Sequence, residues 1–280
     1  MKTVTSISGG KSSAYIAANY PADHLVFSLV RTNDKNVAFK DKYVKKMVED
    51  KLGREFVGTL EDDTIIYTMF DLEQYLGQEI DWVTGNLTFE ELVTKRKFLP
   101  NLFRRFCTTE LKLVPIVHWW ADKFNREPVQ MNIGYRANET NRAKTQIKQL
   151  NANGLSEFKA TFSKHPSGRN KWEVVEWRKP LFPLVKDGVY KMDVENFWKD
   201  KPVRFAEFNN CVGCFHRGTA QLQYLLDAQP EKMAAFIRME EENKGFFKKD
   251  IKYAKIKDLQ LTGNIFDKNS LGCDSGFCGM

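Results

Sequence analysis

Phosphate-binding chemistry is indicated first by six consecutive residues near the start of the chain, Ser8-Gly9-Gly10-Lys11-Ser12-Ser13. Glycine tolerates positive φ angles and has no Cβ, so the backbone of such a loop can approach a phosphate closely. Residues 3–7 alternate like a strand and residues 14–18 read as a helix, so the unpaired first N–H groups of that helix face the anion. The segment predicts a phosphate loop, with an ordinary strand-to-helix turn as the alternative. The Walker A spacing is absent.

A second group of residues suited to anion binding follows a predicted strand at 128–134. Gly134 ends that strand, and Arg136 and Arg142 come after it, six residues apart. Forked guanidinium groups can grip phosphate or sulfate oxygens in pairs. Glu139, between the two arginines, can hold one of them in place or ligate magnesium. The alternative is a solvated loop with a Glu–Arg ion pair.

Cysteines provide a third possible chemistry. Cys211 and Cys214 form a C-x-x-C motif on a turn predicted to enter a helix. Cys107 lies at another predicted helix start, after two arginines, where the positive field favours the thiolate. Cys273 and Cys278 lie in a glycine-rich tail that can fold back. Three or four thiolates around one centre suit zinc or an iron–sulfur cluster. A redox dithiol and a pair of small buried residues are the alternatives.

Basic and aromatic residues alternate in several short segments, and the formal net charge is +7. The segments are Lys95-Arg96-Lys97-Phe98, Arg104-Arg105-Phe106 and Phe246-Phe247-Lys248-Lys249. Cations can neutralise a nucleic-acid backbone while aromatic rings stack on bases. The alternative is a set of solvated helix faces whose aromatic rings belong to the core.

Length and composition limit the class of protein. The chain has 280 residues, of which 42% are hydrophobic, so it can bury a substantial core. No stretch of about eighteen apolar residues occurs, so we expect no membrane span. The first predicted strand begins at residue 3, and we therefore expect no targeting peptide and a cytoplasmic location. Cysteines of cytoplasmic proteins rarely form disulfides.

The elements that must position these residues alternate between strand and helix. After the phosphate loop, the pattern predicts strands at His24–Val30 and Glu55–Leu60, and helices at Val37–Leu52 and Thr64–Leu76. This alternation predicts an α/β fold with a doubly wound, mostly parallel sheet, in which the phosphate loop lies at the carboxyl edge. We divide the chain into a nucleotide-binding α/β domain, 1–185, and a helical, cysteine-bearing C-terminal region, 186–280, packed on it as one unit.

Further along, the pattern predicts mainly helices. They are expected at Thr88–Phe98, Thr108–Phe124, Tyr190–Lys199, Cys214–Ala228 and Glu231–Asn243. Pro115 should kink or strain the second of these. Residues 151–171 are polar and contain glycine and proline, so they read as a surface insertion or mobile loop. Trp172–Trp177 alternates like a strand.

Taken in order, these segments resemble the PAPS reductase-like branch of the adenine-nucleotide alpha-hydrolase superfamily. The resemblance is carried by Ser8–Ser13, which matches a PP-loop usually written S-G-G-x-D-S, and by Cys107–Ile116, Gly134–Arg142, Pro180–Leu184, Asp193-Val194 with Phe197-Trp198, and Asn210–Phe215. It spans residues 3–217.

The resemblance implies a Rossmann-like sheet that binds ATP, or another adenine nucleotide, with Mg²⁺. In many members ATP adenylylates a substrate oxygen with release of pyrophosphate, and sulfur then displaces AMP. The residues that the resemblance assigns to nucleotide binding are Ser8, Gly9, Gly10, Lys11, Ser12, Ser13, Gly134, Arg136 and Glu139. Those assigned to catalysis are Lys11, Arg136 and Arg142.

The resemblance also implies a metal centre and partners. DNA phosphorothioation enzymes and some tRNA thiolases of this kind carry an iron–sulfur cluster. Here the implied ligands of a [4Fe-4S] cluster, or of zinc as the alternative, are Cys107, Cys211 and Cys214 with either Cys273 or Cys278. DNA or tRNA is then the expected acceptor, and a cysteine desulfurase or another sulfur donor is the expected partner.

Two departures from the family pattern keep three functions open. Ser12 stands where the PP-loop usually has aspartate, and the reductases' C-terminal E-C-G-[LI]-H motif is absent. The leading expectation is an ATP pyrophosphatase-type enzyme that adenylylates an acceptor or transfers sulfur on nucleic acid. One alternative is a sulfonucleotide reductase with Cys273 or Cys278 as its nucleophile. The other is a non-catalytic component that binds nucleotide or nucleic acid.

Overall fold

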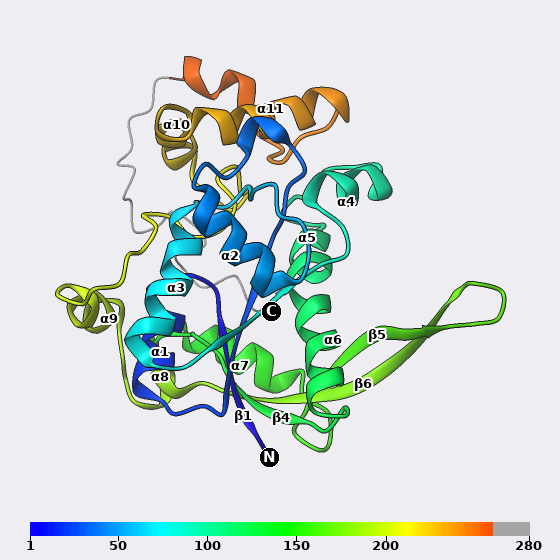
Figure 1. Ribbon diagram of the computed structural model, residues 1–280, viewed down its shortest axis with the longest axis vertical. Coiled ribbons are helices and arrows are strands. Elements are labelled where there is room, and N and C mark those ends of the chain that lie inside the picture. The colour runs from blue at the N-terminus through cyan, green and yellow to red at the C-terminus, as the bar shows by residue number, and fades with distance from the viewer. Residues whose placement is uncertain (260–280) are drawn as a thin grey trace.

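The computed structural model describes residues 1–259, and its six strands form one sheet in the order β3-β2-β1-β4-β6-β5 (Figure 1). The strands are β1 (Thr3–Ile7), β2 (His24–Leu29), β3 (Ile80–Thr84), β4 (Val129–Asn132), β5 (Ser156–Lys164) and β6 (Asn170–Leu181). All neighbours are parallel except β5, which is antiparallel to β6 at the edge. The predicted mostly parallel α/β sheet is confirmed.

Helices cover both faces of the sheet. They are α1 (Lys11–Asn19), α2 (Lys42–Leu52), α3 (Thr64–Leu76), α4 (Phe89–Arg96), α5 (Phe106–Thr108), α6 (Val114–Lys123), α7 (Thr140–Lys148), α8 (Pro183–Lys186), α9 (Lys191–Trp198), α10 (Thr219–Ala228) and α11 (Pro230–Glu242). Consecutive residues of β2 belong to different cores. Phe27 packs with Ala14 of α1, whereas Val26 packs with Trp120 of α6. The doubly wound arrangement follows from this alternation.

The direction of winding reverses between β1 and β4. The chain passes from β1 to β2 and β3 on one side, and then returns to place β4 against the other edge of β1. Ligands of doubly wound sheets bind outside the carboxyl ends of the strands at such a switch point. The phosphate loop directly follows β1, and the arginine-bearing loop follows β4. The topology therefore brings the two predicted anion-binding segments together.

One predicted strand is wrong, and one strand of the structure, β3, was not predicted. Glu55–Leu60 is not a strand of the sheet, and its Gly58 forms only isolated bridges to Thr32 and Ala38. The third strand along the chain is instead β3, which pairs with β2. Gly58 lies so close to the chain that an added Cβ would be 2.4 Å from the carbonyl oxygen of Val37. This crossing of two backbones leaves the segment no room to join a ladder.

Of the two predictions for 151–171, the mobile loop is wrong, because most of the segment belongs to a β-hairpin, whereas the exposed hairpin agrees with a surface insertion. β5 and β6 pair from Ser156 to Lys164 with register shifts at Ser156/Glu157 and Thr161/Ser163, and Gly168 lies in the turn at φ +79°. The hairpin projects from the body of the molecule (Figure 1). Its outer part is exposed on both faces, so it lacks the apolar alternation by which a half-buried strand is identified.

Three predicted helices begin or run differently. The helix predicted from Val37 is α2, which begins at Lys42 after the N-cap Asp41. The helix predicted at Cys214 begins only at Thr219. Thr108–Phe124 is divided into α5, a π-helical turn η2 (Thr109–Leu113) and α6, whose first turn contains Pro115. Proline cannot donate the usual helical hydrogen bond, and this irregularity is the predicted strain around it.

The C-terminal helices close the carboxyl side of the sheet. α10, α11 and the 3₁₀ turn η4 (Tyr253–Asp258) share one hydrophobic cluster with α4 and with Val30 and Leu60. Gly53 and Gly77 end α2 and α3 in the left-handed conformation expected of C-terminal glycines. Among residues 1–259, no helix combines the length and the apolar character that crossing a membrane requires.

Candidate functional site

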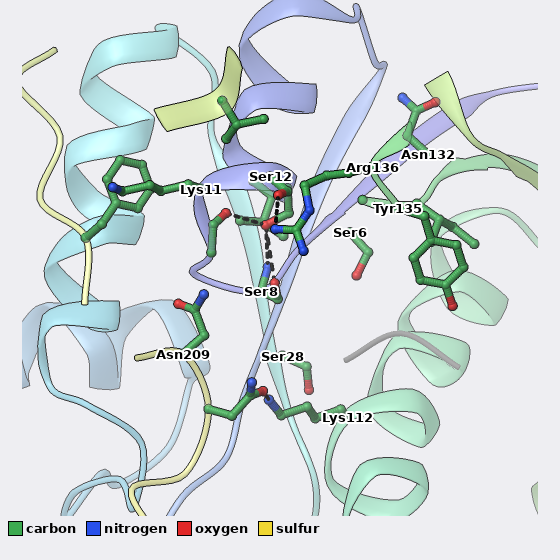
Figure 2. A pocket seen from close by; sticks show the side chains of 18 of the residues that line it. Ser6, Ser8, Lys11, Ser12, Ser28, Lys112, Asn132, Tyr135, Arg136 and Asn209 are labelled. Atoms are coloured by element: carbon green, nitrogen blue, oxygen red, sulfur yellow. Dashed lines mark hydrogen bonds between the residues drawn. The ribbon is translucent and has the colours of Figure 1, made fainter. Parts of the chain in front are cut away.

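A cavity of about 390 Å³ lies at the carboxyl ends of β1 and β4, and we call it the main cavity (Figure 2). Its volume is in the range of small-molecule sites. The sequence-predicted residues that line it are Ser8, Gly10, Lys11, Ser12, Ser13, Gly134 and Arg136. Gly9, Glu139 and Arg142 do not line it and lie behind this surface. The structure therefore brings both predicted anion-binding segments to one cavity.

The two glycines of the phosphate loop are fixed by close packing. Gly9 has φ +79°, and a Cβ added there would lie 2.6 Å from Cγ2 of Ile65 on α3. A Cβ on Gly10 would lie 2.7 Å from Nδ2 of Asn209. Any side chain at these positions would displace the loop or its neighbours. The backbone of the loop is thereby kept bare on the side of the cavity.

The serines of the loop have different tasks. Ser13 Oγ accepts a hydrogen bond from the Ser8 backbone N–H (3.1 Å) and donates one to the Gly10 carbonyl (2.9 Å). This hydroxyl closes the loop and stabilises its shape. Ser12 Oγ instead accepts from Nη1 of Arg136 at 3.4 Å, and Figure 2 shows the guanidinium reaching toward the loop. An anion at Ser12 would therefore also lie beside an arginine.

Lys11 lies at the first position of α1 but has a carboxylate partner. Its Nζ forms an ion pair with Glu195 of α9, and its backbone carbonyl accepts from Trp198 Nε1 at 3.0 Å. The side chain of Lys11 is 36% exposed and that of Glu195 is 42% exposed. Glu195 therefore shares the charge that the sequence assigns to phosphate binding, while the helix N–H groups remain directed at the cavity.

The loop after β4 is built around one buried carboxylate. Glu139 Oε2 accepts from the Arg136 backbone N–H at 3.0 Å and lies 3.3 Å from its Nε. Glu139 Oε1 accepts from Arg142 Nη1 at 2.7 Å. The Arg142 guanidinium also stacks 4.2 Å from the ring centre of Tyr135. Glu139 thus fills the arginine-holding role, one of the two that its position predicts.

Polar residues that the sequence did not single out complete the cavity. Lys112 Nζ donates to Glu61 Oε1 (2.7 Å) and to Asn210 Oδ1 (3.0 Å). Figure 2 shows Lys112 and Ser28 below the phosphate loop, on the side away from Arg136. Lys112 and Asn210 come from segments 98 residues apart. No local pattern links them, and only the fold brings them together.

A smaller cavity of about 40 Å³ adjoins the main one, and we call it the cysteine cavity. Three cysteines line it, namely Cys107, Cys211 and Cys214. Thr108, Lys112 and Asn210 line both cavities, so a single layer of side chains separates them. The structure thus collects the three cysteines that the sequence assigns to one centre.

The C-x-x-C turn is held rigidly in place. The buried Arg217 donates to the backbone carbonyls of residues 209–212 at 2.8–3.2 Å. Tyr253 Oη donates to the Gly213 carbonyl at 3.0 Å, and a Cβ on Gly213 would collide with Phe236 at 2.3 Å. A turn fixed by this many backbone contacts presents its thiols in a defined direction.

Burial controls the protonation of these thiols. Desolvation, followed by the charge of Cys214, raises the pKa of Cys107 to about 12. Burial also raises the pKa of Cys211 well above its ordinary value. The prediction that the local field favours a Cys107 thiolate is therefore wrong for the protein alone, because desolvation outweighs the lowering of the pKa by Thr108 and Lys112. His216 is partly buried and also lines the cysteine cavity.

The donor types fit a thiolate-bound metal, but the described residues do not close a ligand set. Within residues 1–259, no three or more His, Cys, Asp and Glu side chains are grouped so as to hold a metal ion. Cys107, Cys211 and Cys214 form no disulfide within the described part of the chain. Cys273 and Cys278, the candidates for a fourth ligand, lie outside the described residues. The metal assignment stays a prediction.

The basic-aromatic segments divide into surface and core. Phe98 and Phe106 pack edge to face at 5.1 Å, and Arg104 stacks on Phe98 at 4.7 Å, so the first two segments form one patch. Phe103 beside them is 88% exposed. Phe247 of the third segment is instead a core residue. Phe246 and Lys249 of the same segment are exposed, so core and surface residues alternate there, and the nucleic-acid assignment stays a prediction.

No family model matches the chain, and no curated protein or solved structure shows significant similarity to it. The site is therefore interpreted from its geometry together with the resemblance of its motifs.

Proposed function

We propose that the chain is an adenine-nucleotide-dependent enzyme of the PP-loop type that adenylylates an acceptor or delivers sulfur to it, with nucleic acid as the acceptor. The observation that carries this proposal is the contact between the two cavities. The phosphate loop lines one, three cysteines line the other, and Thr108, Lys112 and Asn210 line both. A group activated by the nucleotide and a sulfur centre would then lie on the two sides of one layer of side chains.

The phosphate loop provides the nucleotide site in this proposal. Backbone N–H groups at the start of α1 bind phosphate oxygens, helped by the helix dipole. Arg136, poised 3.4 Å from the Ser12 hydroxyl, adds a guanidinium to the same oxygens. Mg²⁺ accompanies the nucleotide and takes phosphate oxygens and water as its usual ligands. Because Glu139 already binds two arginines, it is not assigned to the metal.

The chemistry proceeds in two displacements. An oxygen of the acceptor attacks the α-phosphorus of ATP, and the bond to pyrophosphate breaks as the new P–O bond forms. Negative charge grows on the departing pyrophosphate, and Arg136 stabilises that charge. Arg142 lies behind Arg136 and is held by Glu139. A sulfur nucleophile from a cysteine desulfurase or another donor then displaces AMP from the acceptor. Without this second step the product is the adenylylated acceptor.

The three cysteines have a defined place in the proposal. Cys107, Cys211 and Cys214 would hold an iron–sulfur cluster, or zinc as the alternative, with Cys273 or Cys278 as the candidate fourth ligand. When bound, such a cluster supplies sulfur or electrons beside the nucleotide. The chain's own contribution is the fixed C-x-x-C turn and a buried wall that limits access of water.

The surface supports a nucleic-acid acceptor. Residues 163–172, at the tip of the β5–β6 hairpin, are all exposed and include Lys164, Arg169, Lys171 and Trp172. A two-stranded ribbon of this kind fits a nucleic-acid groove, and an exposed ring can stack on a base. The Phe98–Phe106 patch adds further cations.

The proposal is tested with anaerobically purified protein, ATP, Mg²⁺ and DNA or tRNA. We expect AMP and pyrophosphate in equal amounts, with release stimulated by nucleic acid. Arg136→Met should lower the rate by about 100-fold or more, the usual effect of losing a group that stabilises charge in the transition state. Arg238→Met, which removes an arginine outside the main cavity, is the matched control. The absence of AMP and pyrophosphate with every nucleic acid offered would refute the proposal.

A binding-only role is the second candidate, and one observation favours it. Lys11 is paired with Glu195, and Ser12 provides no carboxylate in the loop. In that case calorimetry would show tight ATP binding without turnover, even with nucleic acid present. Any ATP turnover above that of Arg136→Met would exclude this candidate.

A further inference from the structure

One arginine in the main cavity has no counter-charge. Arg178 of β6 is only 7% exposed and lines the cavity. Its Nη1 lies 3.3 Å from Met131 Sδ, and its guanidinium stacks 4.4 Å from the Trp177 ring centre. Neither contact neutralises the charge. Within residues 1–259 no carboxylate forms an ion pair with Arg178, and its buried Nε has no hydrogen-bond partner.

The other buried cations of the described chain are compensated. Arg136 pairs with a glutamate, and Lys232 pairs with Asp63 at 2.6 Å. Arg217, at 2% exposed, donates to several backbone carbonyls. A buried charge without a partner destabilises a protein strongly unless something binds it. Arg178 is the exception among these residues, and it lines the main cavity together with the compensated Arg136.

A second unpaired donor lies beside it. Tyr135 is 1% exposed and lines the same cavity, and its Oη has no hydrogen-bond partner in residues 1–259. Burial raises the pKa of this phenol, so it stays protonated and able to donate. Desolvation lowers the pKa of Arg178 to about 10, which still leaves the guanidinium charged at neutral pH. Two buried donors that are electrostatic neighbours therefore line the same cavity.

We propose that Arg178 and Tyr135 form a second anion subsite in the main cavity, which takes a phosphate or carboxylate group of a ligand. A guanidinium fork and a phenol suit the oxygens of such a group, and the anion supplies the missing counter-charge. The subsite is distinct from the phosphate loop, since Figure 2 shows Tyr135 and Lys11 on opposite sides of the cavity. The anion belongs either to a second group on the nucleotide or to an acidic second substrate.

Inorganic phosphate is the probe. The arginine Nε–Hε signals are followed by NMR during a phosphate titration. The signal that is missing from the spectrum of Arg178→Lys is assigned to Arg178. In the wild-type protein this signal should shift with added phosphate until the site is saturated. In thermal melts, phosphate should stabilise Arg178→Met less than wild type, and phosphate binding in calorimetry should weaken by about 10- to 100-fold for this site. Arg238→Met removes an arginine that pairs with Asp34 outside the main cavity, and it should leave the phosphate response unchanged.

A structural role for Arg178 predicts a different result. If the guanidinium only supported the fold, Arg178→Met would melt earlier and keep the full phosphate response. We expect Arg178→Met without phosphate to melt at or above the wild-type temperature, because it replaces an uncompensated charge by an apolar chain of similar length. An unshifted Arg178 resonance, together with equal phosphate stabilisation of Arg178→Met and wild type, would overturn the proposal.

Adding ATP with Mg²⁺ distinguishes the two sources of the anion. If ATP alone shifts the Arg178 resonance and phosphate then adds nothing, the anionic group is on the nucleotide. If phosphate still shifts the resonance at saturating ATP, the subsite serves a second, acidic substrate. Neither result requires ATP turnover, so failure of the proposed function leaves this test intact.

Discussion

Replacing Gly9 by alanine tests how the phosphate loop is held. At φ +79° a side chain costs about 1–2 kcal/mol in backbone strain. The new Cβ would also lie 2.6 Å from Ile65 Cγ2, well inside van der Waals contact. Overpacking of this kind adds about 1–3 kcal/mol. We therefore expect Gly9→Ala to lower the free energy of unfolding by about 2–5 kcal/mol, measured by urea denaturation.

A matched control separates the two contributions. Gly77 has a similar φ of +61°, but a Cβ there meets nothing within 4 Å. Gly77→Ala should therefore lose only the strain, about 1–2 kcal/mol. In an Ile65→Ala background, Gly9→Ala should cost no more than Gly77→Ala. ATP binding by calorimetry should weaken in Gly9→Ala and stay unchanged in Gly77→Ala. Equal losses of stability for the two glycines in the wild-type background would refute the packing argument.

Three further substitutions probe the main cavity and the hairpin. Ser12→Asp places a carboxylate near Arg136, whose Nη1 lies 3.4 Å from Ser12 Oγ. The rate of AMP formation should rise if the missing carboxylate limits turnover. An unchanged rate would contradict this. Glu139→Gln removes the carboxylate charge that pairs with both Arg136 and Arg142. The free energy of unfolding in urea should fall by about 3 kcal/mol, and ATP binding measured by calorimetry should weaken. An ATP affinity equal to that of the wild type would argue against the bridging role. Arg169→Glu should weaken nucleic-acid binding and lower the salt dependence of that binding by about one counter-ion. ATP binding without nucleic acid is the control. An unchanged salt slope would show that the hairpin does not contact the nucleic acid.

The central elements were predictable because their signals are local. The apolar alternation of residues 3–7 and the adjoining glycines specify a strand, a bare turn and a helix in sequence. Thr64–Leu76 is a helix with the predicted bounds, and Gly77 follows it as the C-cap. Such features depend on neighbouring residues, so no knowledge of the rest of the chain is needed to place them.

Elements that depend on distant partners were not predictable in the same way. Glu55–Leu60 has a strand-like pattern, yet the place beside β2 is taken by β3, whose five residues include Asp81. Trp172–Trp177 was predicted as a strand and lies in β6, but residues 163–171 are polar because the outer part of the hairpin leaves the body of the protein, and polarity alone reads as a loop. In both cases tertiary pairing decided the structure against the local signal.

The site shows the same division. Spacing identified the phosphate loop, the two arginines and the cysteines, because each motif is short. It could not identify Arg178, which is one cation among 43 Lys and Arg residues until its burial is known. Nor could it show that Glu195 would meet Lys11, since the two residues are 184 positions apart. Burial and long-range pairing are properties of the fold.

The segment that joins the two cavities has an irregular helix for a physical reason. Cys107 lines the cysteine cavity, whereas Ile116 lines the main cavity. Between them, the π-helical turn at Thr109–Leu113 inserts an extra residue, which rotates the preceding part of the helix relative to α6. The same turn carries Lys112, which is fixed between Glu61 and Asn210. Because these side chains form a common wall, a ligand that moves Lys112 in the main cavity must also move a boundary of the cysteine cavity. Under the proposed function, the π-helical turn is therefore the physical connection through which a nucleotide in the main cavity and the state of the three cysteines should affect one another.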